Sequence, residues 1–171
     1  QTVLDGLKAA NKDPKTAAVF YMGGDPTDGN AAMFLKGAKE VMEAAGIKPV
    51  AEPPGVWDGA KTQTNFEQAL TANGGKVDGV WAANDTNADG VIKVLQDRDL
   101  KGVAVSGQDA NVEGLRNILT GWQTATVYKP VKDEAEAAIK VATDLLNGST
   151  PTADQKLDDG TPYISVTPQL V

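Results

Sequence analysis

The chain has 171 residues, a length that suits one domain with a hydrophobic core and is short for two. Its formal net charge of −7 argues against a nucleic-acid partner, because phosphate binding needs a basic face. The sequence contains no cysteine and no histidine, which excludes disulfides, the usual zinc ligands and the common Ser-His and Cys-His catalytic pairs.

Short apolar runs alternate with segments of helical spacing along the chain. The first run, residues 17–22, is apolar throughout and ends at two glycines, as a strand buried on both faces does. Helical spacing follows over residues 29–46, and Gly46 is a suitable residue to end that helix. Further strands are expected at 47–51, 77–83, 102–106, 124–128 and 163–167, and further helices at 60–73, 88–96, 112–119 and 132–146.

This alternation predicts an α/β fold. Strands and helices that alternate with short connections form a parallel sheet with helices on both faces. We therefore predict a three-layer α/β/α sandwich with a parallel, flavodoxin-like sheet, in which the first five strands stand in the order 2-1-3-4-5.

Polar side chains follow the expected strands, at the positions where parallel sheets bind ligands. They are carboxylates, amides, one tryptophan and one lysine: Asp25, Asp28, Asn30, Trp57, Asp58, Asn84, Asp85, Gln108, Asp109 and Lys129. Such groups complement the hydroxyls of a sugar, and an aromatic ring can cover its apolar face. A single Asp or Asn at such a junction can equally serve as a helix cap, but the whole set favours a polyol site. The set offers no nucleophile beside a base, so we expect no enzyme.

Residues 85–96 match part of a calcium-binding loop. Asp85, Asn87 and Asp89 follow the D-x-N-x-D-G pattern, but position 12 is Gln96, where the pattern needs a bidentate carboxylate. The segment before it has the character of a strand, whereas a calcium loop follows a helix. We therefore predict no metal here. The glycine-rich segment after the first strand lacks the spacing of a phosphate-binding loop, so we also expect no cofactor.

Four motifs carry a resemblance to a known family. In chain order they are Met22-Gly-Gly-Asp-Pro-Thr-Asp-Gly-Asn-Ala31, Ala83-Asn-Asp85, Ser106-Gly-Gln-Asp109 and Gln123-Thr-Ala-Thr-Val-Tyr-Lys-Pro130. Each motif is weak alone, but in this order and spacing the four resemble the xylose-binding branch of the type I periplasmic sugar-binding proteins. The resemblance extends over almost the whole chain and implies one lobe of that two-lobed fold.

The resemblance implies roles for polar residues in the expected loops. Asp28 and Asn30 fall where the family uses a carboxylate and an amide to hold sugar hydroxyls. Asn84 and Asp109 fall on two further polar ligands.

The resemblance also implies a lysine ligand and an aromatic one. Lys129 falls on a ligand at the hinge, and Trp57 lies in the region of the family's stacking tryptophan. The segment around Trp57, residues 53–60, is shorter than the family pattern. The other two tryptophans, Trp81 and Trp122, are expected to be packing or interface residues.

Family members have two lobes that clamp the sugar between them. By this resemblance, residues 1–128 are the C-terminal sugar-binding lobe. Residues 129–171 would comprise the hinge, a helix that in the family belongs to the missing N-terminal lobe, and a returning strand. The apolar side of the helix over 132–146 would then have to fold back on this lobe, form a homodimer with a second copy or stay poorly packed.

The function implied by the resemblance is the substrate-binding component, in part, of an ABC-type sugar transport system. It would bind a monosaccharide such as D-xylose or a related aldose, together with the missing lobe and an ABC transporter permease. The expected location is periplasmic or extracellular, with membrane association through the parent protein. The chain begins at Gln1 without a signal sequence, so a processed or trimmed product is expected. The alternative is the effector-binding domain of a sugar-responsive transcriptional repressor, and an enzyme of flavodoxin or dehydrogenase type comes third.

Overall fold

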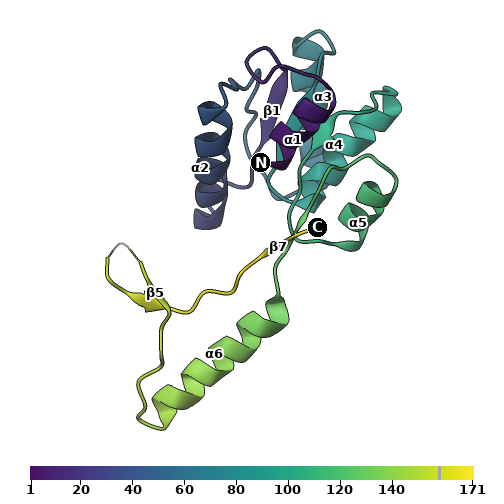
Figure 1. The fold of residues 1–171 in the computed structure, drawn as a ribbon. Coiled ribbons are helices and arrows are strands. Elements are labelled where there is room, and N and C mark those ends of the chain that lie inside the picture. The colour runs from purple at the N-terminus through teal and green to yellow at the C-terminus, as the bar shows by residue number, and fades with distance from the viewer. Residues whose placement is uncertain (158) are drawn as a thin grey trace. The chain divides into compact units, whose positions relative to one another are not determined.

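A computed structural model describes residues 1–157 and 159–171 (Figure 1). These residues form two compact units, one of residues 1–127 with Val171 and the other of residues 128–170. The chain leaves the first unit within β4 (Val127–Tyr128), and Val171, which follows β7 (Gln169–Leu170), belongs to the first unit again. Each unit is described separately below.

A parallel sheet forms the centre of the first unit. It consists of β1 (Val19–Met22), β2 (Gly79–Ala82) and β3 (Ala104–Val105), with β2 in the middle. Parallel bridges add Ala51 beside Phe20 at one edge and Ala125 beside Ser106 at the other. The five apolar runs therefore stand in the predicted order, although the two outer runs contribute single bridges.

Proline explains why the edge segment around Ala51 is so short. Val50 donates its N–H to Val19 O at 2.8 Å, and Tyr21 donates to Ala51 O at 3.0 Å. Pro49 has no N–H to donate, and two prolines follow directly after Glu52. A strand with this composition is restricted to the edge of a sheet.

Six helices lie within the described residues, and their bounds follow the predicted pattern closely for four of them. They are α1 (Thr2–Ala9), α2 (Gly29–Ala44), α3 (Gly59–Ala72), α4 (Asp85–Asp97), α5 (Val112–Leu119) and α6 (Val131–Leu146). α1 was not expected, and α4 begins three residues before the predicted start because Asn84 caps it.

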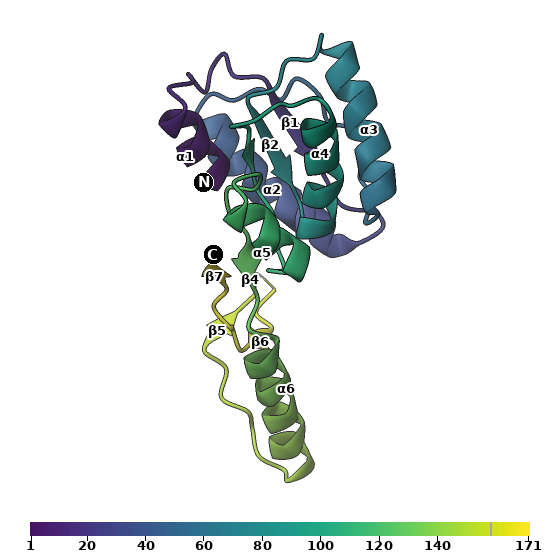
Figure 2. The same cartoon turned by 90° about the vertical axis from the view of Figure 1, so that its right-hand side faces the viewer.

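Helices cover both faces of the sheet (Figure 2). Alternate residues of β1 point to opposite faces. Phe20 and Met22 pack into a cluster with α3 and α4, and the Phe20 ring meets Phe66 edge to face at 5.3 Å. Val19 and Tyr21 pack into a second cluster with α1 and α2. The predicted three-layer α/β/α architecture is therefore confirmed.

The second and third tryptophans are packing residues, as expected. Trp81 lies in β2 and meets Tyr21 edge to face, with ring centroids 5.9 Å apart. Trp122 is partly buried against the cluster formed with α3 and α4. Both rings thus extend the two hydrophobic clusters of the first unit.

The second unit consists of α6 and a hairpin. β5 (Gln155–Lys156) pairs antiparallel with β6 (Pro162–Tyr163), where the sequence had predicted only a strand over 163–167. No residue of α6 is buried, and the side chain of Ile139 is 67% exposed. Across both units, no helix in the described part of the chain has the length and apolar character needed to cross a membrane.

Candidate functional site

Asp28 organises the loop that follows β1. It is the N-cap residue of α2, and its Oδ1 accepts a hydrogen bond from the backbone N–H of Asn30 at 2.9 Å. Its Oδ2 accepts a second hydrogen bond from Trp57 Nε1 at 3.1 Å. A carboxylate oxygen has two lone pairs, so both oxygens can still accept from a ligand hydroxyl. Asn30 lies exposed in the first turn of α2.

Trp57 is held against the backbone of the same loop. A Cβ at Gly24 would lie 2.0 Å from Cζ2 of the Trp57 ring, and a Cβ at Gly55 would lie 2.0 Å from Gly24 O. Val56 also donates its N–H to Gly23 O at 3.2 Å. The glycines therefore allow the segment before α3 to lie directly on the loop after β1, and the ring is only partly buried.

The start of α4 binds these two segments together. Asn84 is the N-cap residue, and its Oδ1 accepts from the N–H of Asn87 at 2.9 Å. The buried Asn87 side chain donates to Gly23 O at 3.1 Å and to Val56 O at 2.9 Å, and it accepts from the Thr62 hydroxyl at 3.1 Å. Asn87 thus fixes the relative position of the loops that carry Asp28 and Trp57.

Asp85 makes the corresponding contacts on the other side of α4. Its backbone N–H donates to Gln108 O at 2.8 Å. Its carboxylate accepts from Gln123 Nε2 at 2.8 Å, from the Thr126 hydroxyl at 2.8 and 2.9 Å, and from the Asn111 N–H at 3.0 Å. One buried carboxylate therefore joins the loop after β3 to the segment before β4.

The segment that matches part of a calcium loop has a different structure. Residues 85–90 form the first turns of α4, and Asp85 is engaged with other protein groups. Within the described residues, no group of three or more His, Cys, Asp or Glu side chains is placed to hold a metal ion.

Asp109 follows β3 in an unusual backbone conformation. Its φ is 101°, the next residue Ala110 has a φ of 50°, and its N–H donates to Val127 O at 2.9 Å. The Asp109 residue is exposed. The loop after β3 therefore presents this carboxylate from a backbone that few L-residues adopt.

The structure brings most of the predicted site residues together. Asp28 bonds directly to Trp57, Asn87 links both to the turn that contains Asn84, and Asp85 links that turn to the residue before Asp109. These loops form one hydrogen-bonded edge of the first unit.

Lys129 belongs to the second unit. Sequence reasoning also missed three buried polar residues that build the edge, Asn87, Gln123 and Thr126. All three residues lie in motifs that the sequence shows, Asn87 in the partial calcium-loop pattern and the other two in the motif over residues 123–130, but no local pattern indicates that their side chains are buried.

The edge carries negative charge. The hydroxyl of Thr27 donates to Asp25 Oδ1 at 2.7 Å and its backbone N–H donates at 2.9 Å, and these bonds hold the pKa of Asp25 below its usual range. Asp25 is therefore ionised at neutral pH. Ionised carboxylates accept strong hydrogen bonds from hydroxyl groups and repel phosphate.

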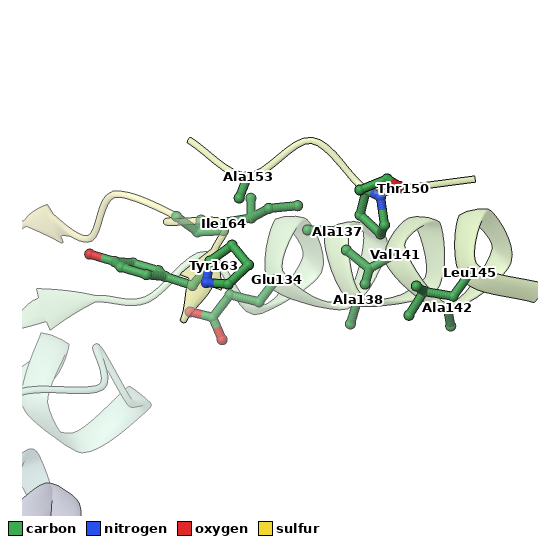
Figure 3. Close-up of a pocket in the computed structure, with 13 residues that line it drawn as sticks. Glu134, Ala137, Ala138, Val141, Ala142, Leu145, Thr150, Ala153, Tyr163 and Ile164 are labelled. Carbon is green, nitrogen blue, oxygen red and sulfur yellow. The ribbon is translucent and has the colours of Figure 1, made fainter. Parts of the chain in front are cut away.

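A separate, apolar cavity lies within the second unit (Figure 3). It has a volume of about 830 Å³, and α6 and the segments around the β5–β6 hairpin line it. Ala137 of the helix lies beside Ile164, and Val141 and Leu145 line the cavity farther along the helix, toward Thr150. None of the six predicted sugar-binding residues lines this cavity, and most of its lining side chains are apolar, with Glu134, Thr150 and Tyr163 as polar exceptions.

Comparison with known proteins gives a consistent result. Residues 3–150 match the profile of a family described as "Periplasmic binding protein domain". The D-xylose-binding periplasmic protein of Escherichia coli (strain K12) is 42% identical over 147 residues, which is 82% of this chain and 44% of that protein. The protein of the same name from Haemophilus influenzae is 41% identical over 147 residues, with the same coverage. The chain spans less than half the length of these curated relatives.

A solved structure shares the fold. It is a periplasmic solute-binding protein of an ABC transporter from Actinobacillus succinogenes, with bound D-allose. The TM-score is 0.81 at 24% sequence identity, and the match covers 99% of this chain and 58% of the other. At this level of identity the likeness shows the architecture alone.

Proposed function

Because the chain belongs to the periplasmic binding protein family, we propose that it is part of the substrate-binding component of an ABC-type sugar transport system. Residues 1–128 would be its C-terminal sugar-binding lobe. The observation that carries the proposal is the hydrogen-bonded edge of the first unit, where four loops bring carboxylate and amide groups beside a half-buried tryptophan. The function of the whole protein is part of the proposal, since the relatives are more than twice as long as the region they share with this chain.

In the proposed site, each kind of side chain at the edge makes a different contact with the sugar. The carboxylates of Asp28 and Asp109 accept hydrogen bonds from sugar hydroxyls, and the amides of Asn30 and Asn84 can donate as well as accept. The ring of Trp57 covers an apolar face of the sugar, and its bond to Asp28 fixes the angle of the ring.

The sugar is a monosaccharide, with D-xylose or a related aldose the first candidate. Two curated relatives at 42% and 41% identity are named for D-xylose, which supports this choice. The same two relatives favour a transport component over the effector domain of a transcriptional repressor. Binding without catalysis is proposed, because the edge is built from hydrogen-bonding groups and the two relatives are named as binding proteins.

The second unit supports the proposal of a missing partner lobe. We assign residues 129–171 to the hinge with Lys129, to a helix of the N-terminal lobe and to a returning strand. The helix α6 has no buried residue, and its side chains line an apolar cavity of about 830 Å³. A surface of this kind needs a cover, which the remaining lobe would provide. When the chain is alone, a second copy pairing through residues 132–146 would serve.

The remaining partner is an ABC transporter permease, to which the two-lobed protein would deliver its sugar. Relatives named as periplasmic proteins support a periplasmic location, or an extracellular one in an organism without an outer membrane. Any association with the membrane would come through the parent protein.

Isothermal titration calorimetry with D-xylose tests the proposal. The two-lobed protein that contains this chain should bind tightly, whereas the 171-residue chain should bind weakly, because one lobe leaves half of the hydroxyls in water. In the two-lobed protein, Asp109→Asn should weaken binding about 10- to 100-fold, since a charge-assisted hydrogen bond contributes about 1.5–3 kcal/mol.

Glu40→Gln is the matched control, because it removes one negative charge from an exposed position of α2. It should bind D-xylose as the wild type does. The site assignment would be wrong if Asp109→Asn behaved like Glu40→Gln. Micromolar binding by the monomeric 171-residue chain would overturn the clamp argument.

A further inference from the structure

We propose that Asp85 and Thr126 form a buried anchor that sets the backbone of residues 109–111, and that they are therefore positioning residues for sugar binding. The proposal rests on the proposed function in one respect: it takes Asp109 as a sugar ligand. Neither Asp85 nor Thr126 would touch the sugar.

The anchored segment has a strained backbone. Asp109 and Ala110 are consecutive non-glycine residues with φ values of 101° and 50°. L-residues rarely adopt such values, and they persist where the surrounding structure fixes them. The backbone that carries the Asp109 carboxylate should therefore move to more favourable φ values if the groups that restrain it were removed.

Three successive N–H groups supply the restraints. Asp109 donates to Val127 O at 2.9 Å, Ala110 donates to the Thr126 hydroxyl oxygen at 3.1 Å, and Asn111 donates to Asp85 Oδ2 at 3.0 Å. Two of the three acceptors are side-chain atoms of the proposed anchor. The strained turn is therefore held by side chains that a substitution can remove.

The single proton of the Thr126 hydroxyl connects the two anchor residues. The Asp85 carboxylate can only accept, so Thr126 donates its proton to Asp85, at 2.8 Å from Oδ1 and 2.9 Å from Oδ2. This donation turns an oxygen lone pair of Thr126 toward the N–H of Ala110. Asp85 therefore acts on Ala110 through the orientation of one hydroxyl group.

The anchor is closed to a ligand. Asp85 and Thr126 are both 0% exposed. A Cβ at Gly107 would lie 2.1 Å from Asp85 Oδ1, and a Cβ at Gly114 would lie 2.3 Å from Oδ2. Backbone on two sides therefore encloses the carboxylate, and it influences the sugar only through the position of Asp109.

Substitutions at Thr126 separate positioning from general stability. Thr126→Val keeps the shape of the side chain and removes the hydroxyl, whereas Thr126→Ser keeps the hydroxyl and removes a methyl group. Thr124→Val is the matched control, because the Thr124 hydroxyl also accepts a backbone N–H, that of Val105 at 3.1 Å, but does not contact residues 109–111.

The first measurement is amide hydrogen exchange by NMR on the 171-residue chain. Thr126→Val should raise the exchange rate of the Ala110 amide about 10-fold or more, because that amide loses its acceptor. Thr126→Ser and Thr124→Val should leave it within about 2-fold of the wild type. Unchanged exchange at Ala110 in Thr126→Val overturns the anchor, whether or not the protein binds a sugar.

The second measurement is an NMR titration of the same variants with D-xylose, at a temperature where all of them are folded. Thr126→Val should weaken binding about 10-fold, and Thr126→Ser should retain wild-type affinity even if its melting temperature is lower. Affinity that follows the melting temperature across the series overturns the positioning role. If neither the wild-type chain nor the two-lobed protein binds an aldose, the proposed function fails, and the exchange measurement still decides the anchor.

Discussion

Two residues that follow the strands, Asp28 and Asn84, serve as helix caps and also lie at the proposed ligand edge. The sequence alone offers capping and sugar binding as alternatives for such residues. The structure shows that capping uses one side-chain oxygen of each residue, and Asp28 still orients Trp57 with the other. The alternatives are therefore compatible: a cap fixes the side chain in the position from which it can meet a ligand.

Tyr21 gives a pH-dependent prediction. Burial, followed by the charges of Glu43 and Glu52, raises the pKa of Tyr21 from 10.0 to about 12. Its hydroxyl has no hydrogen-bond partner within the described residues. Since the folded state retains a proton that the unfolded state loses near pH 10, the free energy of unfolding should fall as pH rises from about 10 to about 12.

Urea unfolding of wild type and Tyr21→Phe at several pH values checks this dependence. Tyr21→Phe should be as stable as the wild type at pH 7, because the hydroxyl it removes is unpaired. Its stability should fall less than that of the wild type across the alkaline window. Parallel pH curves for the two proteins would contradict the assignment.

At the scale of elements, α4 is the part that holds the loops in place. In its first turn, the Asn87 side chain hydrogen-bonds to the segment after β1 and to the segment before α3. The Asp85 side chain hydrogen-bonds to the start of α5 and to the segment before β4. A helix that begins at the carboxyl end of the central strand can reach neighbours on both sides. This position explains why buried polar side chains occur at the start of an otherwise apolar helix.

Asn87→Ala should destabilise the protein and loosen the loop that carries Trp57. The substitution leaves Val56 O and the Thr62 hydroxyl without this partner, and Gly23 O keeps only the N–H of Val56. Leaving buried groups unsatisfied costs about 1–3 kcal/mol. Urea unfolding and tryptophan fluorescence measure the two effects. Asn65→Ala, which removes one exposed bond to Pro54 O, should cost less than about 0.5 kcal/mol. If the two variants lost the same free energy of unfolding, Asn87 would not be more important for stability than an exposed asparagine.

Local patterns were sufficient to predict most elements. The bounds of α2, α3, α5 and α6 were predicted to within two residues, because caps and glycines mark their ends in the sequence. α1 and the β5–β6 hairpin lack such signals. The partners of Asp85 lie up to 41 residues away along the chain, and only the fold brings Thr126 and Gln123 to it. Pairings over such distances have no local signature.

For the whole molecule, the contrast between the two units is the main feature. The first unit has clusters of buried side chains on both faces of its sheet. The second has a helix without a buried residue, in which Ile139 is 67% and Leu146 is 88% exposed. Apolar side chains at this exposure favour association. The first unit therefore has a hydrophobic core of its own, whereas α6 of the second unit leaves its apolar side chains exposed.

Ile139→Asp tests how the chain covers α6. Analytical ultracentrifugation at two concentrations should show the wild-type chain dimerising, and Ile139→Asp should shift it to monomer, because a carboxylate cannot be buried at an apolar contact without large cost. The free energy of unfolding of the monomer should change by no more than about 0.5 kcal/mol. Lys140→Gln, on the polar side of the same helix, should dimerise normally. A monomeric wild type that Ile139→Asp leaves unchanged would exclude pairing through α6.

The hydrogen bonds between Thr126 and Val171 have a consequence for how this chain can be divided. Thr126 N–H donates to Val171 O at 2.9 Å, and Val171 N–H donates to Thr126 O at 2.9 Å. The two residues of the first unit that flank the second unit most closely in these bonds, Thr126 and Val171, are therefore neighbours in space, although residues 128–170 separate them along the chain. Excision of residues 128–170 leaves neighbouring chain ends that a short turn can rejoin. Another segment can therefore replace residues 128–170 without any change in the order of the strands in the sheet of the first unit.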